Sequence, residues 1–428
     1  MIHYIRKTIK LINIILTTSY YRIKYKLKLD AYNDSVINIC NSLLSHSYIF
    51  IKVIQWGIQN VYDLHFNDEL KQYFNTFSNN VPYSKLEKEM AILCIHNAVE
   101  YASTSCNEKL VIENNYIPIN SGSVALVYKA RLNDKPVIIK VLRHNIKKNI
   151  EEDICFLEYF FDNTIVKMII NYYTKINFNI FIKQSRAVLL EQCDFDYEVN
   201  NALLFKKNLK NKKNIVIPYV YKHFTNAYNE IIVMEYIDGP VAKNAPSHQL
   251  QKHFETIRSL YFDSLFRYNI LHGDFHLGNI IIVDENTIGM IDFGIVYEIN
   301  HEISNKLFDI LFLNLNKKEI NYFFKAIKIC IKMICLDEKK HEEIFIKIKN
   351  DREFMDLCLN LKFTGNVFIS GINKIISIDG VELNVYMCNL MLSLMSSLQT
   401  IENMITYMDH DNKSVTTMTK SFIQDIKL

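Results

Sequence analysis

Three polar side chains between residues 271 and 296 have the types and spacing needed for chemistry on phosphate groups. Asp274 ends the motif HGD, Asn279 follows it by five residues, and Asp292 begins the motif DFG. Phosphoryl transfer from a nucleotide requires a carboxylate near the attacking group, together with an amide and a second carboxylate that hold Mg2+ against the phosphates. We therefore predict that Asp274 is catalytic and that Asn279 and Asp292 bind Mg2+.

A β-hairpin is expected to connect these two motifs. The apolar runs 280–283 and 288–291 flank the polar sequence DENT, which is typical of a tight turn between two short strands. His272 and His276 lie beside Asp274, and we expect both to brace the loop rather than to bind a metal ion.

A second hairpin is expected near the middle of the first half of the chain. The runs 124–132 and 137–141 flank a turn at Asn133 and Asp134. Lys140 lies inside the second apolar run. Buried lysines are rare unless they are paired, so we expect Lys140 to bind the phosphates of ATP beside an acidic partner.

The segment before this hairpin is the candidate phosphate loop. Only Gly57 and Gly122 precede residue 239, which excludes a glycine-rich GxGxxG loop. The residues expected to contact the nucleotide are instead Ser121, Gly122, Ser123 and Val124 in the loop, with Glu235 and Ile237 at a hinge beside the adenine ring. No proline follows Pro246, so the Ala-Pro-Glu anchor of a peptide-binding segment is absent and a protein substrate is disfavoured.

Composition limits the remaining classes. The 428 residues are 49% hydrophobic and 22% charged, which suits a large folded core. A net charge of +3 gives no case for a nucleic-acid partner. The nine cysteines form no CxxC pair and therefore predict free thiols rather than disulfides or a zinc site. No apolar run is long enough to suggest a transmembrane helix.

The first 29 residues differ from the rest in charge. They contain seven Lys or Arg and no acidic residue, interleaved with Ile, Leu and Tyr. Such a segment is typical of a mitochondrial targeting sequence or of a helix on an anionic membrane, and a solvated first helix is the alternative.

Taken together, these motifs resemble the UbiB or aarF-domain family of atypical kinases. The loop PINSGSVALVYKA at 118–130 is similar to the alanine-rich loop of that family, and FIKVIQW at 50–56 is similar to its KxGQ helix. The resemblance identifies Lys52 and Gln55 as the KxGQ residues, Asp194 as an acidic partner of Lys52, and Glu198 as the partner of Lys140. Three positions depart from the family pattern, namely Gly122 for alanine, Ile54 for glycine and Gln192 for glutamate.

The resemblance implies an α+β, two-lobed protein-kinase-like fold with an N-terminal helical extension. The domains it implies are a basic segment at 1–30, a helical extension at 31–115, a small lobe with inserted helices at 116–239 and a helical catalytic lobe at 240–428. It implies ATP and Mg2+ as cofactors and a small lipid or quinone-like substrate at a membrane surface. An intracellular, peripheral membrane location follows, in the mitochondrion if the genome is eukaryotic, with the cytoplasm as the alternative.

Two other functions share the HGD and DFG motifs. One is a small-molecule kinase similar to aminoglycoside or choline phosphotransferases, which would lack the loop at 120–125 and the helix at 50–56. The other is a pseudokinase that binds a nucleotide and acts as an assembly partner. The presence of Lys140, Asp274, Asn279 and Asp292 together favours an active enzyme.

Overall fold

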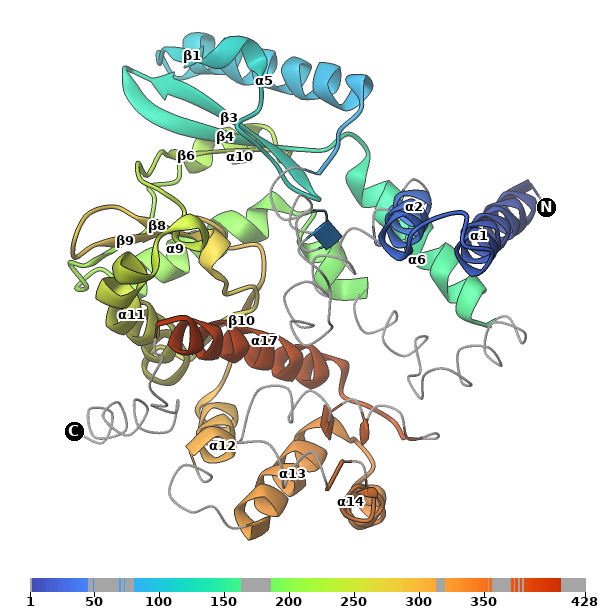
Figure 1. The fold of residues 1–428 in the computed structure, drawn as a ribbon. Helices are drawn as coiled ribbons and strands as arrows, with labels where there is room; N and C mark the ends of the chain where they lie inside the picture. The colour runs from blue at the N-terminus through green and yellow to red at the C-terminus, as the bar shows by residue number, and fades with distance from the viewer. Residues whose placement is uncertain are drawn as a thin grey trace. The chain divides into compact units, whose positions relative to one another are not determined.

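The chain forms two compact units in the computed structural model (Figure 1). The structure describes residues 2–44, 49, 69–70, 73, 81–162, 186–312, 320–352, 354–355, 371–372, 374–375, 378 and 381–408. Of these, unit 1 contains the residues up to 162, residues 186–196 and Tyr219–Tyr236, and unit 2 contains Tyr197–Pro218 and residues 237–408. The two units are interleaved along the chain, whereas the predicted domains are continuous segments, and the predicted boundaries stay predictions.

Unit 1 is built on an antiparallel sheet. Its strands are β1 (Leu110–Ile112), β2 (Asn120–Ser121), β3 (Ala125–Leu132), β4 (Lys135–Leu142) and β6 (Ile231–Glu235). The order is β1-β3-β4-β6, and β2 pairs with the beginning of β3, at Leu126 and Val127. The expected hairpin is confirmed as β3 and β4, and Asn133 and Asp134 both have the positive φ angles of a tight hairpin turn, 48° and 65°.

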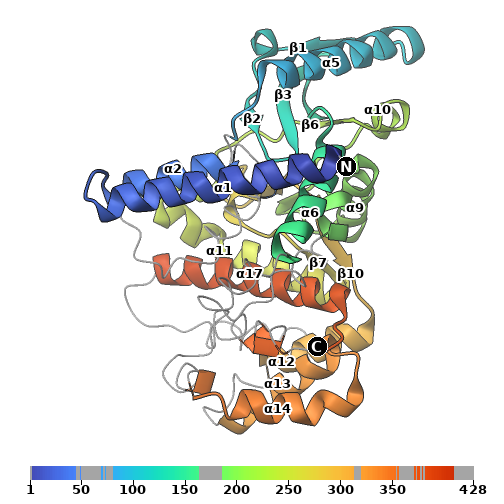
Figure 2. The same ribbon diagram turned by 90° about the vertical axis from the view of Figure 1, so that its right-hand side faces the viewer.

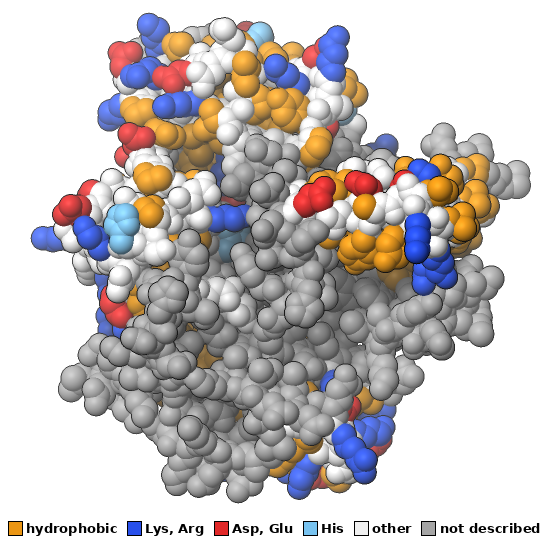
Figure 3. Space-filling view, viewed as in Figure 1, with side chains coloured by type: hydrophobic (Ala, Val, Ile, Leu, Met, Phe, Trp, Pro, Cys, Tyr) orange, Lys and Arg blue, Asp and Glu red, His pale blue; other side chains and the backbone are white. Residues whose placement is uncertain are grey.

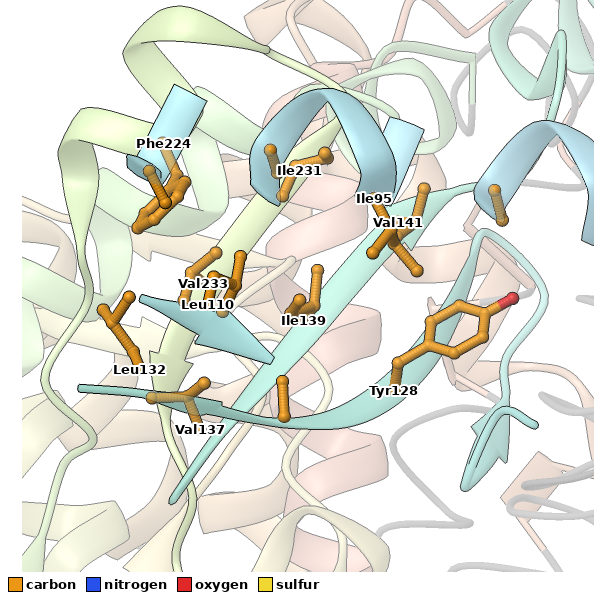
Figure 4. Close-up of a cluster of buried hydrophobic side chains, with 14 of the residues drawn as sticks. Ile95, Leu110, Tyr128, Leu132, Val137, Ile139, Val141, Phe224, Ile231 and Val233 are labelled. Atoms are coloured by element: carbon orange, nitrogen blue, oxygen red, sulfur yellow. The ribbon is translucent and has the colours of Figure 1, made fainter. Parts of the chain in front are cut away.

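Alternation along β3 and β4 gives the sheet one apolar face. Val137, Ile139 and Val141 of β4 are fully buried in a cluster with α5 (Lys85–Ser105), which presents Ala91, Ile95, Ala98 and Ala102 at helical spacing (Figure 4). Successive side chains of a strand point to opposite faces, so Lys140 lies on the face away from this cluster. The sheet therefore places Lys140 on the side of β4 that faces away from the apolar core, where it is buried.

Three further helices form the N-terminal part of unit 1. They are α1 (Ile2–Lys26), α2 (Tyr32–Leu44) and α6 (Ile146–Asp162). Helix α1 packs against both of the others (Figure 2). Ile14 of α1 is buried in a cluster with Ile150 and Ile154 of α6, and Lys10 Nζ lies 3.0 Å from Asp153 Oδ1. The described part of the predicted helical extension at 31–115 includes α2 and α5, but its last residues form strand β1, which pairs with β3.

Unit 2 contains most of the helices. Its elements are α9 (Phe195–Asn208), which begins in unit 1, then β5 (Ile215–Val216), α11 (Ser247–Phe262), β7 (Ile270–His272), β8 (Ile280–Ile282), β9 (Ile288–Met290), β10 (Val296–Glu298), α12 (His301–Phe312), α13 (Ile320–Ile334), α14 (His341–Lys349) and α17 (Val385–Met408). The expected hairpin between the two motifs is confirmed as β8 and β9, to which β5 adds in parallel.

One strand pair was not expected from the sequence. Beyond Gly239 the sequence predicts helices apart from one hairpin, but β7 and β10 also pair, with His272 opposite Val296. Each of these strands has only three residues, too few for an alternating pattern to be recognised. They pair because the chain returns after the DFG motif alongside the strand that precedes the HGD motif. None of the described helices is long and apolar enough to cross a membrane.

Candidate active site

Two hydrogen bonds of Asn279 connect the segments that carry Asp274 and Asp292 in unit 2. The Nδ2 atom of Asn279 donates to the carbonyl oxygen of Asp274 at 3.1 Å. The carbonyl oxygen of Asn279 in turn accepts the N–H of Ile291 at 3.1 Å, directly before Asp292. Asn279 thus bonds to Asp274 through its side-chain amide and to the residue before Asp292 through its backbone. The three predicted residues therefore belong to one hydrogen-bonded arrangement.

His272 hydrogen bonds to the backbone of both Asp274 and Asp292. Its Nε2 atom lies 2.7 Å from the carbonyl oxygen of Asp292, so Nε2 carries the proton and donates. Nδ1 then accepts the N–H of Asp274 at 3.2 Å. Burial lowers the pKa of His272, which favours this neutral form. The expected bracing role of His272 matches these contacts.

Aromatic rings complete the support. The rings of Phe205 and Phe293 lie 5.4 Å apart, and that of His272 lies 5.9 Å and 6.2 Å from them. Phe205 belongs to α9, and Phe293 is the central residue of the DFG motif. Edge-to-face and tilted ring pairs of this kind add to the apolar burial. The HGD motif, the DFG motif and α9 therefore pack against one another in unit 2.

Gly273 allows the loop that carries Asp274 to approach the segment beyond the DFG motif. Its N–H donates to the carbonyl oxygen of Ile295 at 2.8 Å. A Cβ atom at this position would lie 2.4 Å from Cγ2 of Ile295 and 2.7 Å from the ring of Tyr297. A larger residue would therefore push β10 away from the loop that carries Asp274.

The charges at the site suit a hard cation. His276 Nε2 lies 3.6 Å from Asp274 Oδ2, and His276 Nδ1 accepts the N–H of Gly278 at 3.0 Å. Burial lowers the pKa of His276, but the carboxylates of Asp274 and Asp292 outweigh burial and raise it. Carboxylate and amide oxygens are the ligands that Mg2+ prefers, so Asn279 and Asp292 fit the ion that the sequence predicts.

Helix α9 is attached to the DFG motif through a residue that the sequence does not single out. The Nδ2 atom of Asn201 donates to the carbonyl oxygen of Phe293 at 2.9 Å. Glu198, three residues earlier and so on the same side of the helix, is only 7% exposed. Lys140 is 8% exposed and belongs to unit 1, so its pairing with Glu198 stays a prediction.

A buried arginine in unit 1 holds the candidate phosphate loop. Arg143 follows β4, and its side chain is fully buried. Its Nε donates to the carbonyl oxygen of Gly122 at 2.9 Å and its NH2 group to Ser121 Oγ at 2.8 Å. Its backbone N–H donates to the carbonyl oxygen of Val124 at 2.9 Å. Ser123, between these residues, is also buried.

The same guanidinium reaches the start of α5. It donates to the carbonyl oxygens of Val81 and Pro82, both at 3.0 Å, and its NH1 lies 2.9 Å from Glu87 Oε1. Glu87 closes a capping box with Ser84. Burial raises the pKa of Glu87, but the hydrogen bonds from Ser84 and Arg143 outweigh burial and lower it. The loop at 121–124 is thus fixed to α5 through one ion pair.

Replacing Gly122 by alanine tests the flexibility of this loop. A Cβ atom would meet only the carbonyl oxygen of Ala125 at 3.5 Å, an ordinary contact. We expect Gly122→Ala to stabilise the chain by about 0.4–1 kcal/mol and to change the ratio of ATP to ADP affinity. Urea unfolding and nucleotide titration measure both. Unchanged affinities for both nucleotides would show that the loop does not select between them.

The remaining predicted residues lie at three places. Glu235 is exposed and accepts the N–H of Tyr219 at 3.1 Å, while Ile237 is buried in unit 2, so the expected hinge coincides with the boundary between the units. Asp194 Oδ1 accepts the N–H of Asp196 at 3.0 Å at the start of α9. Lys52 and Gln55 lie outside the described residues, so the predicted contact of Asp194 with Lys52 stays a prediction.

Arg143 and Asn201 contribute to the site, but neither belongs to a sequence motif that indicates a function. Arg143 lies three residues after Lys140, and an arginine directly after a buried strand is one signal that could have found it. Asn201 lies three residues after Glu198 and therefore on the same face of the helix, and this spacing is the signal that could have found Asn201. Both residues act on backbone carbonyl groups, which no motif describes.

Comparisons with known proteins find relatives that are named as kinases. A probable protein kinase UbiB of Shewanella sp. (strain MR-4) is 29% identical over 192 residues, which are 43% of this chain and 34% of that protein. The same protein of Shewanella sp. (strain ANA-3) is 30% identical over 176 residues, covering 40% of this chain and 31% of the relative. The chain thus spans about a third of the length of these relatives.

A solved structure and a family profile complete the comparison. The structure described as the complex of Rv3197 and erythromycin from Mycobacterium tuberculosis covers 84% of this chain and 92% of its own, with a TM-score of 0.42 and 14% identity. The profile of the ABC1 atypical kinase-like domain matches residues 89–323, which is more than half of the chain and includes Lys140, Glu198, Asp274, Asn279 and Asp292. The chain therefore belongs to the ABC1 atypical kinase-like family, whose mixed helix and strand fold it shares.

Proposed function

We propose that the chain is an ATP- and Mg2+-dependent kinase or ATPase of the UbiB type that acts on, or is coupled to, a small lipid such as a quinone precursor. Asp274 is the catalytic carboxylate, and Asn279 and Asp292 hold Mg2+. Lys140, oriented by Glu198, binds the phosphates below the loop Ser121–Val124, and Glu235 to Ile237 contact the adenine ring. Family membership supports the kinase-like part of this proposal.

The observation that carries the proposal is the bonding around His272. A single neutral imidazole fixes the N–H of Asp274 and the carbonyl oxygen of Asp292, and Asn279 is bonded to Asp274. An ordinary loop and hairpin need no such link between two acidic residues 18 positions apart. Phosphoryl transfer does need it, because positioning and charge stabilisation supply nearly all of the catalysis.

The reaction follows from these positions. Mg2+ supplies positive charge to the phosphate oxygens when it is bound by Asn279 and Asp292. Asp274 takes the proton of the attacking hydroxyl group or water. The oxygen of that attacking group bonds to the γ-phosphorus, and the bond from the γ-phosphorus to the bridging oxygen breaks, which releases ADP. His276, 3.6 Å from Asp274, counters the negative charge of the carboxylate before transfer.

The acceptor is proposed to be a lipid rather than a protein, because the chain lacks the proline anchor of a peptide-binding segment. The test is phosphate release and product analysis with purified full-length chain, MgATP and a prenylated phenol in detergent. We expect the phenol to raise turnover or to become phosphorylated, while a basic protein substrate stays unmodified. Faster transfer to choline or an aminoglycoside would support the small-molecule kinase, and transfer to the protein substrate would contradict the proposal.

Helix α1 supports the proposed membrane contact. Its exposed residues Ile9, Ile12, Leu16, Tyr20 and Ile23 recur at helical spacing and form one face, here called the α1 stripe. Figure 3 shows hydrophobic side chains beside Lys and Arg over the region of α1 and α2. Helix α1 itself contains no acidic residue, although its Lys10 and Lys24 pair with Asp153 and Asp30. An apolar face flanked by basic residues suits an anionic lipid surface.

Two substitutions in the α1 stripe test this contact. We expect Ile12→Ser combined with Leu16→Ser to weaken binding to vesicles that contain anionic lipid by about tenfold or more, since each apolar side chain buried in lipid stabilises the complex. Vesicle sedimentation measures the binding, and Leu93→Ser on the exposed face of α5 is the matched control. Equal binding by both variants would exclude α1 as the contact.

The proposed location in the cell has two parts, a membrane surface and an organelle. The expectation of a mitochondrial location keeps only its basis in the sequence, namely the composition and the basic first 29 residues, because the relatives reported above are bacterial. A peripheral position on a membrane is the part of the expectation that the α1 stripe supports.

A further inference from the structure

Three metal-binding side chains of unit 1 converge at a place that the proposed phosphoryl transfer does not use. They are Cys106, which ends α5, Glu108, which precedes β1, and His223 of α10 (Lys222–Ala227). One donor atom of each lies within 4.8 Å of the others. The sequence pattern does not indicate this cluster, because 115 residues separate Glu108 from His223.

Local backbone geometry explains how the first two donors reach the same point. Asn107, between them, has a φ of 52°, in the left-handed region that asparagine tolerates better than most residues. The N–H of Glu108 then donates to the carbonyl oxygen of Ala102 at 2.8 Å, which fastens the turn to the last turn of α5. Cys106 and Glu108 are thereby held beside each other as a fixed pair.

The third donor is oriented by its neighbours. The ring of His223 lies 4.5 Å from that of Phe224 and 6.4 Å from that of Tyr101. Its Nε2 atom lies 3.0 Å from Glu108 Oε2, so this nitrogen already faces the carboxylate. The side chains of His223 and Glu108 are 37% and 22% exposed, which leaves a path for an ion from solvent.

An ion pair alone does not explain the cysteine. A partly exposed histidine–glutamate pair contributes about 0–1 kcal/mol and needs no thiol. Cys106 Sγ instead joins the cluster, within 4.8 Å of the donor atoms of Glu108 and His223. Sulfur, imidazole nitrogen and carboxylate oxygen together are the donor set of Zn2+ rather than of Mg2+ or Ca2+.

We propose that Cys106 Sγ, Glu108 carboxylate and His223 Nε2 bind one Zn2+ ion, with water as the fourth ligand. Tetrahedral coordination at zinc bond lengths places donors about 3.3–3.6 Å apart. The imidazole and the carboxylate lie 3.0 Å apart and need to separate slightly, and the thiolate lies within 4.8 Å of both. The bound ion links the C-terminal end of α5, the approach to β1 and α10, and so stabilises unit 1. This site is separate from the proposed Mg2+ ligands Asn279 and Asp292, which belong to unit 2.

The experiment uses the full chain after removal of metal with a chelator. Zn2+ is titrated against a chromophoric chelator, and Co2+ serves as a spectroscopic probe of thiolate ligation. We expect one Zn2+ per chain with a dissociation constant below about 1 μM, a thiolate-to-cobalt charge-transfer band, and a higher thermal midpoint with Zn2+. Cys106→Ser should abolish the band, and Cys106→Ser and His223→Gln should each weaken Zn2+ binding by about 100-fold.

Cys94→Ser provides the matched control, since Cys94 lies on the same helix and is partly buried beside Glu230 rather than in the cluster. It should bind Zn2+ as wild type does. Glu108→Gln retains the shape of its side chain and keeps the test valid if the cysteine variant misfolds, with an expected weakening of about tenfold or more. The absence of a cobalt–thiolate band in wild type, or Zn2+ affinity unchanged in the Glu108 and His223 variants, would overturn the proposal. Neither result bears on MgATP turnover.

Discussion

Replacing Arg143 by methionine is expected to lower the free energy of unfolding by about 3–5 kcal/mol, the cost typical of breaking a buried ion pair from one side. Methionine fills much of the volume but donates no hydrogen bond. It would leave the carbonyl oxygens of Val81, Pro82 and Gly122 and the carboxylate of Glu87 without the guanidinium. Each buried acceptor that loses its donor adds to the cost. Urea unfolding of the purified chain measures the change.

A matched arginine on the same sheet is the control. Arg131 of β3 pairs with Glu113 at 2.9 Å but is 53% exposed, so Arg131→Met should cost less than about 1 kcal/mol. The double variant Arg143→Met with Glu87→Gln should recover part of the loss, because it removes the uncompensated carboxylate. If Arg143→Met and Arg131→Met destabilise the chain equally, Arg143 does not hold the loop as described.

The same ion pair gives a pH dependence of known sign. The pKa of Glu87 in the folded chain lies below its ordinary value of 4.5, so its stabilisation is present above that pH and is lost as the pH falls through the folded value. The gap in unfolding free energy between wild type and Glu87→Gln should therefore be largest near neutral pH and should shrink below pH 4.5. A gap that does not depend on pH would contradict the lowered pKa.

Substitutions at the two aspartates should separate metal binding from chemistry. Asp292→Asn should weaken Mg2+-dependent nucleotide binding and lower turnover by about 10²-fold or more, because a charge aimed at the phosphates is lost. Asp274→Asn should lose turnover by a similar factor while nucleotide affinity stays within about threefold. Asp284→Asn, in the exposed turn of the same hairpin, should change neither property. Nucleotide titration with and without Mg2+ and phosphate release measure both quantities.

Local patterns were sufficient to predict the short elements around the site. The β3–β4 and β8–β9 hairpins were predicted because turn residues lie between apolar runs. The order of Lys140, Asp274, Asn279 and Asp292 indicated a kinase-like protein, and the loop at 118–130 together with the sequence FIKVIQW at 50–56 indicated the family. In each case the signal lies within about ten residues or in a fixed order of motifs.

Contacts between distant segments could not be predicted in the same way. Arg143 bonds to Val81, 62 residues away, and Asn201 bonds to Phe293, 92 residues away. Both side chains donate to backbone carbonyl oxygens, which every residue has, so the partner leaves no mark on the sequence. The pairing of β7 with β10 was missed because it depends on where the chain returns after the DFG motif. Tertiary geometry, not residue type, determines these contacts.

The most direct test of the proposed function is phosphate release from MgATP by the purified full chain, compared with Asp274→Asn under the same conditions. An active ATP-dependent enzyme requires wild type to exceed the variant by about 10²-fold or more while both bind the nucleotide with similar affinity. If wild type binds MgATP but releases phosphate no faster than Asp274→Asn, the chain is a nucleotide-binding scaffold and the proposed catalytic role of Asp274 is wrong.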